Sequence, residues 1–226
     1  MIRKFFYWIW KAMLWFFGLS ILSVIIFKWV PIPITPLMIT RIIEFKLDAE
    51  DAIYSHNWVP LDEISPNLQK AVIASEDGNF LIHSGFDFGA MQKAFKNNNK
   101  GKRLKGGSTI SQQTAKNVFL WQGRSYIRKG LEAYFTVLIE LIWGKERIME
   151  VYLNSIEMGD GVYGAQEAAR CWYRTTAIAL TPRQAAGIAA ILPNPRKFKA
   201  SNSSSYIERR KDKIMRVMRY IGKIDY

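Results

Sequence analysis

A long apolar and aromatic stretch near the N-terminus constrains the fold more than any other feature. Residues 5–30 carry only two charges, Lys11 and Lys28, which lie near the ends, and residues 12–27 carry none. With its flanking aromatic side chains, the stretch reaches the ~20 residues that a bilayer core requires. A cleaved signal peptide is the alternative, but its apolar region would span about 7–15 residues and end in a small-x-small site. No such site follows residue 27, and we predict an uncleaved transmembrane anchor.

The residues on either side of the anchor predict its orientation and the way the chain leaves the membrane. Arg3 and Lys4 precede the span, which places the N-terminus in the cytoplasm and the rest of the chain on the other side. Three prolines then predict a stiff, extended stem: Pro31, Pro33 and Pro36. The chain thus divides into a cytoplasmic N-terminus (1–8), an anchor (9–30), a stem or connector (31–62) and one further domain (63–226).

The charge balance points to an anionic partner. A formal net charge of +13 suits nucleic acid, anionic lipid or a phosphorylated substrate. No acidic residue lies between Asp87 and Glu132, whereas this interval holds Lys93, Lys96, Lys100, Lys102, Arg103, Lys105, Lys116, Arg124, Arg128 and Lys129. The single cysteine, Cys171, excludes an intrachain disulfide and a cysteine-based metal site, and the two distant histidines argue against a histidine-based one. No Ser-x-x-Lys pair occurs, which excludes that acyl-enzyme apparatus.

A glycine pair opens a polar segment, residues 105–116, inside this basic region. Gly106 and Gly107 allow the backbone to wrap closely around a ligand, and the following Thr-x-x-Gln has the spacing of a helix capping box. A helix start presents unpaired N–H groups and a partial positive charge, which suit a phosphate. If the helix continues, one polar stripe contains Thr109, Gln112, Gln113 and Lys116. The alternative is a solvated helix face behind a glycine turn. The spacing of a P-loop is absent.

A candidate general base stands at the end of an earlier helix. Ser65 and the proline after it predict a helix start, and Leu68, Val72 and Glu76 then share one face. Glu76 therefore ends an apolar stripe, where burial would raise its pKa and suit it to accept a proton. An ordinary acidic helix end, with Asp77, is the alternative, although acids at a helix C-terminus work against the dipole.

The remaining patterns predict more helices and few strands. We expect residues 78–105 to be loop or mobile helix with a flexible flap around 97–102, and Ser125 to cap a helix that carries Arg128 and Glu132 four residues apart. The last helix has a basic face, which we interpret as solvated and near anionic membrane. Further helices are expected at 133–143, 145–154, 165–170, 183–192 and 206–224. The domain is predicted to be mainly α.

Four ordered motifs give the chain a family resemblance that spans residues 65–192. Residues 76–87, EDGNFLIHSGFD, resemble the motif EDxxFxxHxGxD, and residues 106–113, GGSTISQQ, resemble a second motif that continues to Lys116 and Asn117. Residues 128–132, RKGLE, with Glu140 are similar to a third, and residues 145–168 to a fourth with Asn154, Gly159 and Gly164 in register. In this order, the motifs resemble the peptidoglycan glycosyltransferases of family 51, specifically the monofunctional membrane-anchored type.

The resemblance implies a lysozyme-like α-helical fold with a second lobe partly dipped into the membrane, and lipid II as the substrate. It implies inverting, single-displacement synthesis of β-1,4-linked glycan with loss of undecaprenyl diphosphate. Glu76 would be the general base, and Glu132 a second essential carboxylate that positions cations or a divalent metal. Lys116 and Arg124 would bind the pyrophosphate. Further substrate-binding residues carried over are Asp77, Lys105, Ser108, Thr109, Gln112, Gln113, Asn117, Arg128 and Asn154.

The resemblance also implies a setting for the enzyme. We expect a single-pass protein of the bacterial inner membrane with a periplasmic catalytic domain. Lipid II and the growing glycan are the expected partners, together with cross-linking penicillin-binding and division proteins, and no nucleic acid. No organic cofactor and no protein-held metal are expected, while a divalent cation (Mg²⁺ or Mn²⁺) is left open. A lytic, glycan-cleaving enzyme of the same fold and a non-catalytic binder of anionic polymer or lipid are the alternatives.

Overall fold

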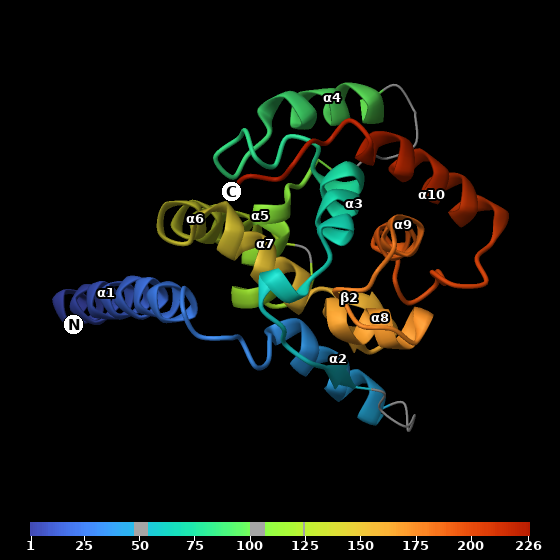
Figure 1. Cartoon of the computed structure of the whole chain (residues 1–226). Helices are drawn as coiled ribbons and strands as arrows, with labels where there is room; N and C mark the ends of the chain where they lie inside the picture. Colours follow the sequence, from blue (N-terminus) through green and yellow to red (C-terminus); the bar gives the residue numbers. More distant parts are fainter. Residues whose placement is uncertain (48–53, 100–106, 124) are drawn as a thin grey trace.

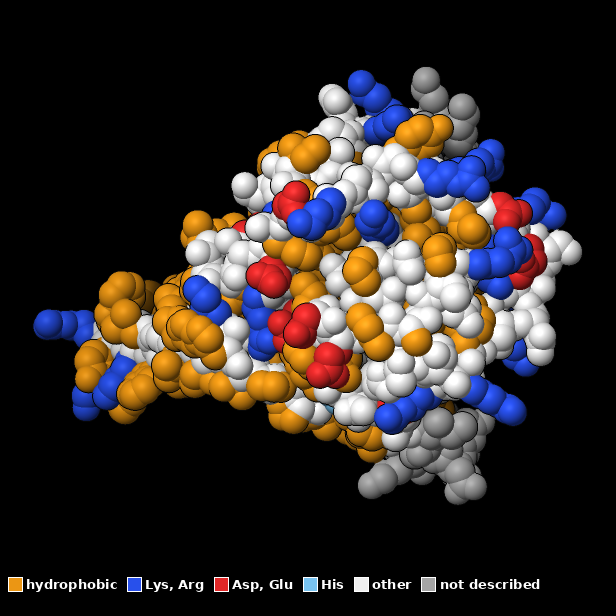
Figure 2. Space-filling model, viewed as in Figure 1, with side chains coloured by type: hydrophobic (Ala, Val, Ile, Leu, Met, Phe, Trp, Pro, Cys, Tyr) orange, Lys and Arg blue, Asp and Glu red, His pale blue; other side chains and the backbone are white. Residues whose placement is uncertain are grey.

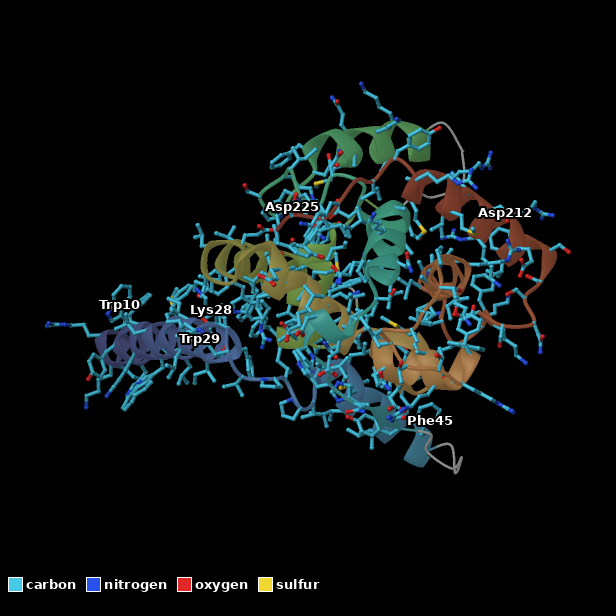
Figure 3. All side chains as sticks on the ribbon, in the orientation of Figure 1. Trp10, Lys28, Trp29, Phe45, Asp212 and Asp225 are labelled. Carbon is cyan, nitrogen blue, oxygen red and sulfur yellow. The ribbon has the colours of Figure 1, made fainter. Side chains whose placement is uncertain are left out.

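The N-terminal apolar stretch forms one long helix, α1, Ile2–Phe27. In the computed structural model, which describes residues 1–47, 54–99, 107–123 and 125–226, α1 projects from the rest of the molecule (Figure 1). It is long and apolar enough to cross a membrane. Apolar side chains cover its surface (Figure 2), and Trp10 on α1 and Trp29 just beyond it are exposed (Figure 3). A helix with apolar side chains all round is typical of a membrane span or of a buried core helix, and most of α1 is not covered by protein.

The rest of the chain is mainly helical, as predicted. A short 3-10 turn, η1, covers Leu61–Glu63. The α-helices are α2 (Pro36–Leu47), α3 (Pro66–Glu76), α4 (Phe88–Asn99), α5 (Ile110–Phe119), α6 (Tyr126–Ile142), α7 (Gly144–Ser155), α8 (Ala165–Tyr173), α9 (Pro182–Ile191) and α10 (Ser205–Met218).

A small sheet joins the stem to the body. Its strands are β1 (Ser55–His56), β2 (Glu157–Gly159) and β3 (Val162–Tyr163) in the order β1-β3-β2. β1 pairs parallel with β3, and β2 pairs antiparallel with it. Strands of two or three residues are too short to show alternation in a sequence, which explains why no strand was predicted.

The core forms where α3 meets helices on both sides. α9 and α10 pack against α3, while α5 packs between α6 and α7 (Figure 1). α9 is rich in alanine and is buried from Ala185 to Ile191, so its backbone can approach α3 closely. The caps predicted from sequence are present: Ser65 accepts from Asn67 N–H at 3.3 Å, and Ser125 accepts from Arg128 N–H at 3.1 Å. These caps set where α3 and α6 begin.

Residues 88–99 form a helix within the segment expected to be loop or mobile helix, and the Asp87 carboxylate accepts from Ala90 N–H at 2.7 Å at its start. Residues 97–99 of the expected flap end this helix, and residues 100–102 lie outside the described residues. One helix boundary is corrected. α10 ends at Met218 rather than at 224, and it lies on the side of the body away from α1 (Figure 1). The apolar residues of α10 are held against α9 and α3, and the position of its basic face near anionic membrane stays a prediction.

Candidate active site

Glu76 is the last residue of α3 and reaches toward α5. One carboxylate oxygen accepts from the Gln113 amide at 3.2 Å, and the other accepts from the Ser75 hydroxyl at 3.2 Å. The side chain is half-buried, so it keeps a route to a ligand while part of its hydration is removed. The predicted position at the end of an apolar stripe is confirmed, since Leu68 and Val72 are fully buried below it.

Gln113 links Glu76 to a buried phenol. The Tyr152 hydroxyl donates to the Gln113 side-chain oxygen at 3.4 Å, while the Gln113 nitrogen donates to Glu76. Burial raises the pKa of Tyr152 well above its ordinary value, and the charges of Glu76 and Asp77 raise it further. Tyr152 therefore stays protonated and holds the amide in the orientation that presents N–H to the carboxylate. Tyr152 was not singled out from the sequence, because nothing in a helical repeat reports a hydrogen bond.

Asp77 ties α3 to the start of α5. Its buried carboxylate accepts from Ile110 N–H at 2.9 Å and from His83 Nε2 at 2.9 Å. The Gly85 N–H donates to His83 Nδ1 at 3.1 Å, which requires the proton on Nε2. The Thr109 hydroxyl donates to the Gly85 carbonyl at 2.7 Å and closes the ring of contacts. Asp77 thus occupies the dipole-favoured N-terminus of α5 from within the protein.

The start of α5 is built as predicted, but it is not a solvated face. Thr109 and Gln112 form a complete capping box and are both buried. Gln113 and Lys116 are half-buried, and Ser108 alone among the predicted residues here is exposed. The alternative of a solvated helix is therefore wrong, because the polar stripe faces α3 and α6.

A cluster of cations surrounds the next turn of α5, around Lys116. Burial lowers the pKa of Lys116, the buried Glu132 opposes this, and the positive charges of Arg128 and Lys129 add to it. Arg128 donates to the Glu132 carboxylate at 3.2 Å, and Lys129 also contacts that carboxylate. One carboxylate thus pairs with two cations and lies near a third, Lys116, an arrangement that favours an added anion.

A second carboxylate locks α5 to its neighbours without facing Glu76. Glu140 on α6 accepts from the Ser111 hydroxyl at 2.5 Å and from Lys145 at 2.7 Å. The Lys145 ammonium also lies 4.7 Å from the centre of the Phe80 ring. Glu140 is therefore engaged in fixing the helix that carries Gln113 and Lys116.

Other predicted residues are placed differently or are not described. Asn154 is fully buried: its amide donates to the Val59 carbonyl at 2.9 Å and its oxygen accepts from Val59 N–H at 3.0 Å. Its predicted substrate contact does not fit this environment, because both ends of the amide already hold the stem. Asn117 is buried on α5. Lys105 and Arg124 lie outside the described residues.

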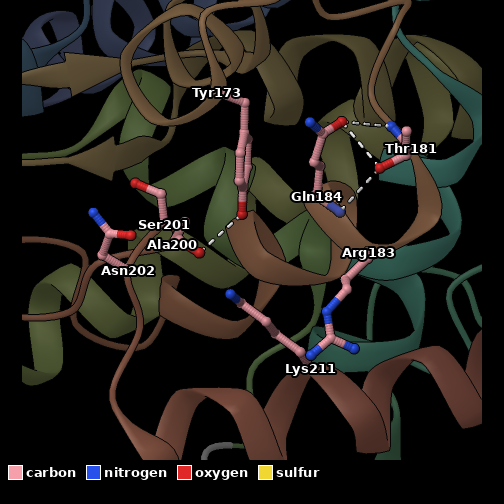
Figure 4. A pocket seen from close by; sticks show the side chains of 8 residues that line it. All are labelled: Tyr173, Thr181, Arg183, Gln184, Ala200, Ser201, Asn202 and Lys211. Carbon is pink, nitrogen blue, oxygen red and sulfur yellow. Dashed lines mark hydrogen bonds between the residues drawn. The ribbon is translucent and has the colours of Figure 1, made fainter.

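A surface pocket lies away from this site. It has a volume of about 340 Å³ and opens between α9, α10 and the end of α8, with Tyr173, Arg183 and Lys211 in its wall (Figure 4). The Arg183 and Lys211 cations are paired with Glu208, at 2.6 and 2.7 Å. Because these charges are neutralised and lie apart from Glu76, the pocket is not part of the candidate active site.

The candidate site contains no ready set of protein metal ligands. Within the described part of the chain, no group of three His, Cys, Asp or Glu side chains lies close enough to hold a metal ion. The Glu132 carboxylate, the predicted alternative ligand, is occupied by Arg128 and Lys129. These residues do not fit a metal held by the protein alone.

The mainly α fold places a half-buried carboxylate about one turn of α5 away from a group of cations, an arrangement suited to an enzyme that moves a proton beside an anionic group. A family model described as Transglycosylase matches residues 46–219, most of the chain. The chain belongs to this transglycosylase family and is a peptidoglycan glycosyltransferase.

The names of similar proteins from several bacteria support this assignment. A biosynthetic peptidoglycan transglycosylase of Pseudomonas syringae pv. syringae (strain B728a) is 53% identical over 216 residues, 96% of this chain and 92% of the relative. Relatives of the same name from Bacteroides thetaiotaomicron and Caulobacter vibrioides are 52% and 54% identical, over 94% and 86% of this chain and 86% and 82% of their own lengths. The family resemblance is therefore confirmed along nearly the whole chain.

Proposed function

We propose that the chain polymerises lipid II into β-1,4-linked glycan strands by inverting glycosyl transfer and releases undecaprenyl diphosphate. The observation that carries this proposal is the arrangement along α5. Gln113, which binds the Glu76 carboxylate at 3.2 Å, stands three residues before Lys116, one turn along the same helix. α5 thus carries both the side chain that holds the proton acceptor of α3 and an anion-binding cation.

In this reaction, Glu76 acts on the attacking side. The 4-hydroxyl of the lipid II N-acetylglucosamine loses its proton to the Glu76 carboxylate as its oxygen bonds to the anomeric carbon of the growing strand. The Gln113 amide and the buried Tyr152 behind it hold that carboxylate in place. A hydroxyl is a weak nucleophile at its own pKa, and a positioned base contributes about 10²–10⁴-fold in rate.

The cation cluster acts on the leaving side. As the bond between the anomeric carbon and the diphosphate breaks, negative charge develops on the diphosphate oxygens. Lys116, with Arg128 and Lys129 beside it, stabilises this charge, and Arg124 and Lys105 remain proposed contacts. Loss of one such contact costs about 3–4 kcal/mol in comparable sites. A single displacement inverts configuration, which turns an α-linked donor into a β-linked product.

We further propose that any divalent cation, Mg²⁺ or Mn²⁺, is held mainly by the substrate diphosphate. Mg²⁺ commonly binds through substrate phosphates and retained water, and Glu132 is already paired. The enzyme would sit in the bacterial inner membrane with its catalytic domain in the periplasm. Exposed apolar side chains on α6, Ile127 and Leu141 among them, support contact of α6 with lipid. Cross-linking partners, penicillin-binding or division proteins, would act on the product.

The test is polymerisation of labelled lipid II by the full chain in detergent. Glu76→Gln keeps the shape of the side chain and one acceptor oxygen, and it is expected to reduce the rate at least about 100-fold, because the base is lost. Glu63→Gln, an exposed carboxylate in η1, is the matched control and should retain full activity. Glycan synthesis by Glu76→Gln near the wild-type rate would refute the base role. Release of fragments from cell wall without polymer would instead indicate a lytic enzyme.

A further inference from the structure

The end of the anchor helix is capped by side chains of the catalytic domain. The last four carbonyls of a helix have no partner within the helix. In α1, the Val24 carbonyl accepts from Trp143 Nε1 at 2.7 Å. The Phe27 carbonyl accepts from both Nε and Nη2 of Arg147, at 3.1 and 2.8 Å, and Arg147 reaches on to the Val30 carbonyl at 2.7 Å. The two carbonyls between them accept from backbone N–H groups of the following turn.

The side of the same helix is packed into the domain. Val24 is fully buried and belongs to the main hydrophobic core. One turn earlier, the hydroxyls of Ser20 and Tyr134 on α6 lie 2.8 Å apart. The Phe27 ring lies 6.2 Å from the ring of Phe119, the last residue of α5. The anchor thus contacts the helix that carries Lys116, three residues before Phe119.

The length of α1 agrees with a division into two parts. It has 26 residues, about 39 Å at 1.5 Å per residue, whereas a bilayer core requires about 20 residues. A surplus of about six residues corresponds to the turns that Trp143 and Arg147 cap. Unpaired carbonyls at the edge of the hydrocarbon would be costly, and a cation at a helix C-terminus also complements the dipole.

Arg147 is itself held in place. It pairs with Glu150 at 2.7 Å, and its guanidinium lies 5.2 Å from the centre of the Trp58 ring in the stem. A planar, multidentate side chain gripped on two sides is suited to hold two carbonyls at once. The lysine that replaces it in a conservative variant can offer only a single point charge.

We infer that Arg147 and Trp143 form a latch that fixes the anchor to the catalytic domain and sets the depth of α5 relative to the bilayer. They are positioning residues: they touch no substrate and act through α1 and α5. The inference rests on the proposed function in one respect, that the substrate diphosphate is tethered to a lipid at the membrane surface. The latch then matters for long-chain, membrane-held substrate and not for the chemistry.

The kinetic test compares two substrates on the full chain. Arg147→Met/Glu150→Gln removes the arginine part of the latch, which holds the Phe27 and Val30 carbonyls, without leaving Glu150 unpaired. We expect at least about a tenfold loss of kcat/KM on lipid II in vesicles, since small misplacements are costly. Turnover of a short-chain lipid II analogue, assayed in solution without detergent, should be unchanged. Arg147→Lys should recover part of the kcat/KM that is lost on lipid II in vesicles. Arg183→Met, a paired surface arginine on α9, is the control and should match wild type.

A second measurement reports the latch without catalysis. Cys171 is the single cysteine and is exposed on α8, so it can be labelled without other changes. Energy transfer from this label to a dye at the vesicle surface should give a narrow distance distribution in wild type. The distribution should broaden in the double variant, and to a smaller extent in Trp143→Phe, which keeps the ring and loses the donor.

The outcomes separate the two claims. An unchanged distance distribution together with an unchanged vesicle rate in the double variant would overturn the latch. An equal loss of rate on both substrates would also overturn it, because it would indicate damage to the site itself. If wild type polymerises neither substrate, the proposed function fails, and the distance measurement still decides whether the latch exists.

Discussion

Removal of the Asp77 carboxylate should weaken the attachment of the end of α3 to the start of α5. Asp77 accepts from Ile110 N–H at 2.9 Å and from His83 Nε2 at 2.9 Å, and it is 6% exposed. Asp77→Ala would leave both donors buried without a partner. Hydrogen bonds to a charged group are worth about 1.5–3 kcal/mol each, so two give about 3–6 kcal/mol. The lower figure is the better expectation, because the variant no longer has to bury a charge.

The assay is thermal unfolding of the full chain in detergent, followed by lipid II kinetics. For a chain of this length, about 3 kcal/mol corresponds to a fall of about 6–12 °C in Tm. Asp77→Asn keeps one acceptor and should lose about half as much. Asp62→Ala, an exposed acid in η1, should stay within about 0.5 kcal/mol of wild type. A raised KM with an unchanged Tm in Asp77→Ala would refute this reasoning, because it would indicate the direct substrate contact first predicted.

Two further predictions concern Gly85 and Lys116. Gly85 has φ +87°, and an added Cβ would lie 2.8 Å from Thr136 Cγ2. Gly85→Ala should therefore lower the free energy of unfolding in denaturant by about 2–4 kcal/mol. Gly130→Ala, in the open interior of α6, should raise it by up to about 1 kcal/mol, and equal effects of the two changes would contradict the role of φ. Burial lowers the pKa of Lys116, so the charged lysine destabilises the fold at neutral pH, and this cost disappears as pH rises toward the pKa of a free lysine. Lys116→Met should therefore raise Tm at pH 7, by less at pH 10, and reduce polymerisation about 10²–10³-fold; a lower Tm with normal turnover would be the opposite of both expectations.

Much of the architecture could be predicted because it depends on local chemistry. Ser65 and Ser125 begin helices, and Thr109 with Gln112 forms a capping box, since each cap needs only its own next turn. The long apolar helix α1 followed from length and composition alone. Glu76 could be singled out because a carboxylate at the end of an apolar stripe is unusual for any helix.

The parts that escaped prediction depend on distant partners. Tyr152 lies 39 positions from Gln113 along the chain, and no periodicity connects the two. Asn154 carries an amide of the kind that often binds ligands, yet this amide donates to the carbonyl of Val59, 95 positions away. The family resemblance marked Asn154 as a substrate-binding residue, whereas the structure shows both ends of its amide bound to the stem.

The contact of Asn154 with the stem has a consequence for how far the enzyme can work from the membrane. Asn154 binds both backbone groups of Val59, and β1 is paired with β3 just before it. The described part of the connector is thus bound to the body at β1 and at Val59. If the proposed polymerisation takes place at the membrane, a catalytic unit held in this way stays close to the bilayer surface, and the growing strand has to move away from the enzyme as each sugar is added.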